Sequence, residues 1–235
     1  MADSNRKTNA LTGEALKRFG KHVSREKALL LFIGTMLACA LPALNGIRLW
    51  DRIPEIVETG LIGSDGRDDS LPRAVLVYGV PGLMCALNLI CHGQLWLNQK
   101  RGTLPATPVR LIGRGGIPFI SVLFVSAAII RAAGEKPDIS FFAPCILSLL
   151  LMLAGGHFFD CPRSSKLALH LKAIEYKEKA WQTTHRIAGI CCMAAGLITL
   201  TVLMLAGSLD LAVLGVTLLL LAFPIVYACK IANRS

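Results

Sequence analysis

Three of the five histidines stand where they could act together. His92 and His157 lie near the ends of two apolar runs, and His185 lies at the start of a third. If successive runs cross a membrane in opposite directions, the three side chains reach a similar depth. Neutral imidazoles at one depth could gather a transition metal or ligate haem. No H-E-x-x-H pair or C-x-x-C framework accompanies them. We therefore expect structural or interfacial hydrogen bonds, with no metal site and no cofactor.

The polar residues inside apolar runs are the second group with chemical potential. Asn88 and His92 are spaced i, i+4 and share a helical face, and Asn45 interrupts an earlier run. Such groups are costly against lipid, so we expect them to point into a bundle. With nearby prolines they permit a small cavity, which keeps a small-molecule or ion transporter open. A nucleophile needs a positioned base, and no G-x-S-x-G string or pair of intramembrane carboxylates occurs. The chain is predicted not to be an enzyme.

The elements that must position these residues are long apolar runs. The chain has 235 residues, of which 54% are hydrophobic and 17% charged, and its mean hydropathy is +0.57. A bilayer-crossing helix needs roughly 20 apolar residues, and the runs lack the alternation of barrel strands. The eight cysteines fall mostly in these runs and are interpreted as reduced, apolar packing residues. We predict an all-α polytopic integral membrane protein. Its six transmembrane helices are expected at about 28–50, 74–97, 117–133, 141–158, 187–207 and 211–227.

The distribution of basic residues predicts the orientation of these helices. With both termini in the cytoplasm, nineteen of the 25 Lys and Arg residues lie inside and six outside, as the positive-inside rule requires. The net charge of +10 is spread over short segments rather than one soluble face, so we expect no direct nucleic-acid partner. The resulting divisions are a basic cytoplasmic tail (1–27), two helices with an acidic outer loop (28–97), two further helices (98–158), a cytoplasmic amphipathic connector (159–186) and the last two helices (187–235).

A short string at the end of the connector resembles a known family signature. The string WQTTHRIAG contains Trp181, Thr184, His185, Arg186 and Gly189, and it resembles the W-x-x-T-H-R-x-x-G signature of the SdpI family. This family comprises bacterial multi-helix membrane proteins. Its namesake gives immunity to a secreted toxic peptide and holds a transcriptional repressor at the membrane. The upstream family pattern is only half kept, since Ser164 stands at an expected Asn.

A second resemblance lies in the predicted outer loop, residues 51–73. Asp51, Arg52 and Pro54, followed by Gly66, resemble the small domain that commonly precedes the SdpI region, although Ile56 stands where that domain has a His.

Together the two resemblances imply a protein of the bacterial inner (cytoplasmic) membrane. Its implied partners are the lipid bilayer, a membrane-active peptide toxin outside and a transcriptional repressor inside. A transporter and a metal- or haem-binding membrane protein are the alternatives.

Overall fold

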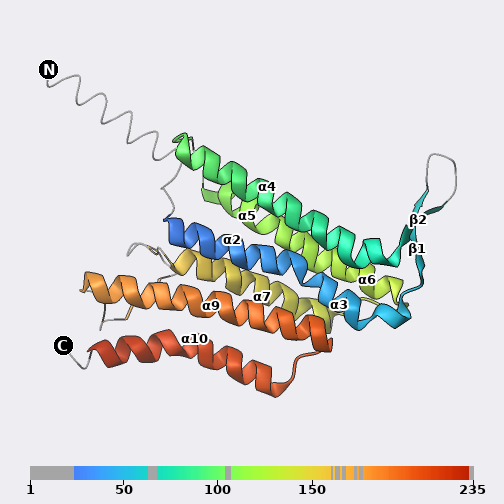
Figure 1. Ribbon diagram of the computed structural model, residues 1–235. Helices are drawn as coiled ribbons and strands as arrows, with labels where there is room; N and C mark the ends of the chain where they lie inside the picture. The colour runs from blue at the N-terminus through green and yellow to red at the C-terminus, as the bar shows by residue number, and fades with distance from the viewer. Residues whose placement is uncertain are drawn as a thin grey trace.

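The structure, a computed structural model, describes residues 24–62, 68–103, 107–159, 161, 165, 168–171, 174 and 177–232. Within them, six helical segments are long and apolar enough to cross a membrane, as the apolar runs predict. The segments pack side by side into one bundle (Figure 1).

The first span is divided by a proline. Helix α2 (Arg25–Ala40) begins where the side chain of Ser24 accepts a hydrogen bond from the Lys27 N–H at 3.3 Å. Helix α3 (Pro42–Arg48) continues the span after a break at Leu41. Pro42 has no N–H to donate, so the helical ladder is interrupted at this point.

The second and third spans each contain a π-helical turn close to a proline. The turn η2 (Val75–Gly79) leads into α4 (Val80–Lys100), which has Pro81 in its first turn. The turn η3 (Ser121–Val125) lies between α5 (Thr107–Ile120), which contains Pro118, and α6 (Ser126–Ala132). Pro81 has no N–H to donate to the carbonyl of Val77, which lies within η2, and a locally widened turn is one way for the helix to accommodate this loss.

The last three spans are single helices. They are α7 (Ile139–Phe158), α9 (Glu178–Ala206) and α10 (Leu211–Ala232). Helix α9 ends at Gly207, whose φ of 78° is the left-handed conformation that glycine adopts most readily.

Two ends of the bundle can be distinguished in Figure 1. At one end α2 and α9 begin and α4, α7 and α10 end; we call it the basic end, because most Lys and Arg residues belong to the segments there. The other, the hairpin end, carries strands β1 (Ile56–Ile62) and β2 (Asp68–Pro72).

The hairpin corrects the expectation of an entirely α-helical chain with a turn-rich outer loop. The two strands pair antiparallel, with Val57 opposite Leu71. Only a few alternating apolar residues stand among the glycines and acids, so a short edge hairpin is hard to distinguish from a loop by pattern.

Two predicted helix boundaries also differ from the structure. Helix α5 begins at Thr107, about ten residues before the expected start, and α9 begins at Glu178 rather than at 187. In both helices the first turns are polar. A boundary placed by hydropathy leaves these turns out, although their backbone continues the helix. The connector between α7 and α9 therefore spans residues 159–177. Of the residues predicted to form its amphipathic helix, 165, 168–171 and 177 lie outside helices, and others lie outside the described residues.

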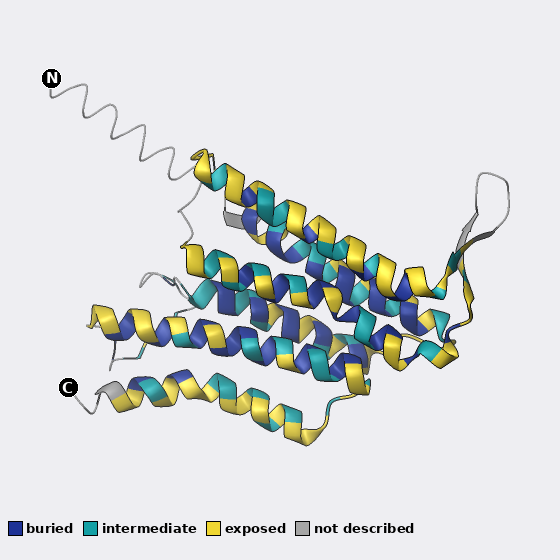
Figure 2. Cartoon of the chain, in the orientation of Figure 1, coloured by how far each residue is buried: buried dark blue, intermediate teal, exposed yellow. Residues whose placement is uncertain are grey.

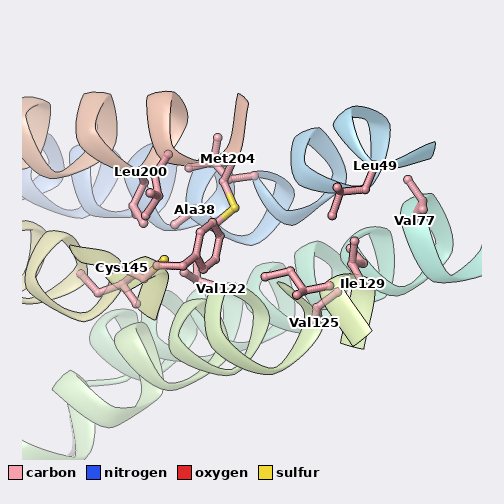
Figure 3. Close-up of a cluster of buried hydrophobic side chains, with 14 of the residues drawn as sticks. Ala38, Leu49, Val77, Val122, Val125, Ile129, Cys145, Leu200 and Met204 are labelled. Carbon is pink, nitrogen blue, oxygen red and sulfur yellow. The ribbon is translucent and has the colours of Figure 1, made fainter. Parts of the chain in front are cut away.

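The core lies between α2, η3, α7 and α9, where small and branched side chains interdigitate. Ala38, Val122, Cys145, Leu200 and Met204 lie together there (Figure 3), and all five are completely buried. The outward faces are largely exposed and apolar (Figure 2), as expected where lipid is the solvent. Helix α10 packs against α9 and is the most exposed span.

Candidate functional site at the basic end

The signature residues fold as the first turns of α9. Trp181, Thr184 and His185 are buried, and Gly189 is buried one turn further on. Spacings of four residues place Trp181, His185 and Gly189 on one helical face. Arg186 points elsewhere, with about half of its side chain exposed.

His185 is held by backbone groups on both ring nitrogens. Its Nε2 accepts a hydrogen bond from the Leu169 N–H at 3.1 Å, and its Nδ1 lies 2.9 Å from the carbonyl oxygen of Trp181. An acceptor at Nε2 and a donor at Nδ1 define the neutral tautomer with its proton on Nδ1. The imidazole therefore joins the connector to the first turn of α9.

Trp181 makes a second attachment to the connector. Its indole Nε1 donates to the carbonyl oxygen of Cys161 at 3.1 Å, and its ring stacks on His185 with 4.1 Å between centroids. The same indole packs with Ile174 of the connector and Ala228 of α10. The Trp181–His185 pair thus unites α9, the connector and the last helix at the basic end.

An open hollow of about 530 Å³ lies beside this pair. Arg186 lines the hollow. Its guanidinium forms an ion pair of 2.6 Å with Glu26 of α2 and lies 5.4 Å from the ring centroid of Phe159. Cys161 lines the same hollow, and burial raises the pKa of its thiol, while a hydrogen bond with Ser165 and the charge of Lys27 act in the opposite direction. The hollow combines charged and aromatic groups of a kind that contacts a peptide or a headgroup.

Gly189 has a packing role. A Cβ on Gly189 would lie 2.8 Å from the carbonyl oxygen of Gly155 and 3.0 Å from the backbone nitrogen of Phe159. Helices α7 and α9 therefore touch backbone to backbone here, as small residues allow in membrane bundles.

The predicted intramembrane polar residues fall into two places. Asn88 and His92 meet at Thr35 of α2, whose hydroxyl lies 3.1 Å from the Asn88 Nδ2 and 3.1 Å from the His92 Nε2. Asn45 lies toward the hairpin end instead, where its Oδ1 accepts from Arg48 at 2.8 Å. Thr35 was not predicted: a hydroxyl 53 residues from Asn88 leaves no local signal in the sequence.

The three histidines that could have gathered a metal take separate partners. His157 lies 3.0 Å from the Ser165 hydroxyl and 3.6 Å from the Cys161 sulfur, whereas His92 lies between α2 and α4. Among the described residues, no group of three or more His, Cys, Asp or Glu side chains is arranged to hold a metal ion.

The residues of the second resemblance, in the predicted outer loop, lie next to the helices at the hairpin end. Arg52 pairs with Glu135, which follows α6. Arg73, after β2, lies 4.5 Å from the centroid of the Trp50 ring. Asp51 belongs to the 3-10 turn Trp50–Arg52, and Pro54 is exposed. Gly66 lies outside the described residues.

The six apolar helices define the class of this chain as a multi-pass membrane protein. Comparison with protein-family models, curated proteins and solved structures finds no match.

Proposed function

We propose that this chain is an SdpI-like protein of the bacterial inner membrane, with both termini in the cytoplasm. In this role it gives immunity to a secreted membrane-active peptide toxin, relays the presence of the toxin to a cytoplasmic regulator such as a transcriptional repressor, or does both. The observation that carries the proposal is the Trp181–His185 pair. The most unusual residues of the signature together attach the connector to α9.

A relay needs an element that reaches from one face of the membrane to the other. Helix α9 has 29 residues and a length of roughly 43 Å at 1.5 Å per residue. At the hairpin end, the guanidinium of Arg48 lies against Gly207, the C-cap residue of α9. At the basic end, the same helix holds the connector through His185. A displacement at the outer ends of α3 and α9 would reach the connector through one rigid helix.

The outer segment has the charge to meet a cationic peptide. Residues 51–73 contain six acidic and three basic residues. Opposite charge accelerates encounter and raises local concentration, although it adds little sequence specificity. The hairpin is the proposed meeting point, because it projects beyond the helices (Figure 1).

Survival of cells exposed to peptides secreted by sibling cells tests immunity. A strain lacking the gene should be killed, and the wild-type gene should restore survival. His185→Leu should restore it poorly, whereas Gln182→Ala, an exposed position on the same helix, should restore it fully. Unchanged survival of the deletion strain would overturn the proposed immunity.

Co-purification from native membranes after crosslinking tests the relay. Recovery of a DNA-binding protein with the wild type, and less of it with His185→Leu, is the expected result for a relay. A preparation that contains lipid alone would favour direct protection.

The Thr35–Asn88–His92 contact supports a second candidate, a small-molecule or ion transporter. Polar groups buried between α2 and α4 are a common feature of solute paths. Liposomes containing the protein should then show solute flux that falls with Asn88→Leu and persists with Gln94→Ala, an exposed position on α4. Flux no greater than that of empty liposomes would remove this candidate.

A further inference from the structure

A groove opens between α2 and α4 at the basic end of the bundle. It has a volume of about 940 Å³, within the roughly 300–1,000 Å³ that small-molecule sites occupy. Arg25, the first residue of α2, and Lys100, the last residue of α4, both line it. Leu29, Phe32 and Leu89 line it within the span. The groove is therefore basic where the helices end and apolar along its length.

A contact between the two helices joins the walls of the groove. Helices α2 and α4 separate toward the basic end (Figure 1). Further into the span, the rings of Phe32 and His92 meet edge to face with 5.4 Å between centroids, and the His92 Nε2 lies 3.1 Å from the Thr35 hydroxyl. His92 is eight residues before Lys100, which corresponds to roughly 12 Å along α4. The groove thus extends well into the apolar part of the span.

Trp96 indicates the level of the membrane interface in this groove. Its side chain is 53% exposed, and the ammonium of Lys100 lies 3.7 Å from the centroid of its ring. Trp is enriched at the level of lipid headgroups, and a Lys near the end of a membrane helix extends its ammonium to that level. Both residues line the groove. The charged part of the groove therefore lies with the headgroups, and the apolar part lies with the acyl chains.

The charges around the groove favour an anionic ligand. None of the described residues that line it is acidic. Glu26 follows Arg25 in α2, but its carboxylate forms an ion pair of 2.6 Å with Arg186 of α9 and lines the other hollow. Helices α4 and α5, the other elements near the groove, contain no Asp or Glu. A negatively charged headgroup at this position complements the two basic residues.

We propose that this groove binds an anionic phospholipid, with its phosphate between Arg25 and Lys100 and an acyl chain along the apolar walls. A guanidinium donates two parallel N–H bonds to a phosphate, and an ammonium binds it as a point charge. Leu29 and Leu89 are 59% and 54% exposed, so the walls belong to the outward apolar face, where lipid is the solvent. The proposal goes beyond the immunity or relay role and does not depend on it.

Native mass spectrometry of the intact protein in a neutral detergent tests the choice of headgroup. The probes are phosphatidylglycerol and phosphatidylcholine with the same acyl chains. One basic residue at the membrane surface favours an anionic lipid by roughly fivefold, so two should favour phosphatidylglycerol by about thirtyfold. The double variant Arg25→Gln/Lys100→Gln should lose most of this preference. Arg101→Gln, an exposed position at the same end that does not line the groove, should keep it.

A pair of glycine variants in α4 tests the shape of the groove. Gly93 lines it, and a Cβ on Gly93 would meet no atom within 4 Å. The side chain of Gly93→Leu should enter the groove and weaken the binding of phosphatidylglycerol by roughly tenfold. Gly82 has equally open space but does not line the groove, so Gly82→Leu should bind as the wild type does.

Three results would each overturn the proposal: equal affinity of the wild type for the two lipids, an unchanged preference in the double variant, or equal binding by Gly93→Leu and Gly82→Leu. The same spectra give the mass of the complex. A dimer of the protein that Gly93→Leu dissociates would assign the groove to a second copy of the chain and would also overturn the lipid site. If the double variant does not fold, Lys100→Gln replaces it. This variant should lose about fivefold of the preference, and an unchanged preference would count against the proposal in the same way.

Discussion

At the scale of single residues, His185 should control how firmly the connector is attached. His185→Leu removes the acceptor of the Leu169 N–H, and an unsatisfied backbone donor costs roughly 1–3 kcal/mol. His185→Gln keeps an amide oxygen near the position of Nε2. The measurement is the alkylation rate of Cys161, followed peptide by peptide with mass spectrometry. We expect about a tenfold faster reaction in the Leu variant for each 1.4 kcal/mol lost, and less acceleration in the Gln variant.

The control for this measurement is Gln182→Ala, which changes an exposed side chain one residue after Trp181. Its Cys161 should react at the wild-type rate. Equal rates in the wild type and His185→Leu would show that His185 does not hold the connector.

The reaction of Cys161 should also have a shifted pH dependence. Burial raises the pKa of this thiol more than the Ser165 hydrogen bond and the Lys27 charge lower it. Alkylation requires the thiolate, and a raised pKa keeps the thiol protonated to higher pH. The alkylation rate of Cys161 should therefore climb at a higher pH than that of free cysteine in the same buffer. A rise at the same or a lower pH would contradict this environment.

At the scale of helices, the contact of α7 and α9 depends on Gly189. In Gly189→Ala the new methyl group would meet backbone atoms of Gly155 and Phe159, which cannot move aside as a flexible side chain can. We expect a loss of roughly 1–3 kcal/mol from overpacking, reduced by up to about 1 kcal/mol through the better helix propensity of Ala. Thermal unfolding in detergent should show a lower Tm than the wild type.

A matched helix variant separates packing from propensity. Gly82 lies in α4 with no atom within 4 Å of a built Cβ, so Gly82→Ala should leave the Tm unchanged or raise it. If both variants shift the Tm equally, the close approach at Gly189 is not the cause.

At the scale of the whole molecule, the charge distribution predicts the orientation in the membrane. The sequence has nineteen Lys and Arg residues in the segments predicted to share one side of the membrane and six in the others, so the positive-inside rule predicts that the side with nineteen is cytoplasmic. Alkaline phosphatase inserted between Gly66 and Arg67 should be active, and a fusion after Ser235 should be inactive. Activity only in the C-terminal fusion would reverse the orientation.

Much of the architecture follows from the sequence, because hydropathy is a local property. Each of the six apolar runs forms a span, and prolines mark the break before α3 and the π-helical turn η2. The starts of α5 and α9 were misplaced because their first turns are polar. Arginines four residues apart on one helical face, with Ile112 on the opposite face, are the signal in the sequence that α5 begins early.

By itself, the sequence determined the six spans and singled out Trp181, His185 and Gly189. Only the tertiary structure decided what these residues do: His185 accepts from Leu169, Trp181 donates to Cys161, and Gly189 admits the backbone of α7. It likewise brought Thr35 to Asn88 and buried Arg114. The physical reason is that apolar runs and charge are local properties of the sequence, whereas hydrogen-bond partners and burial depend on which helices become neighbours.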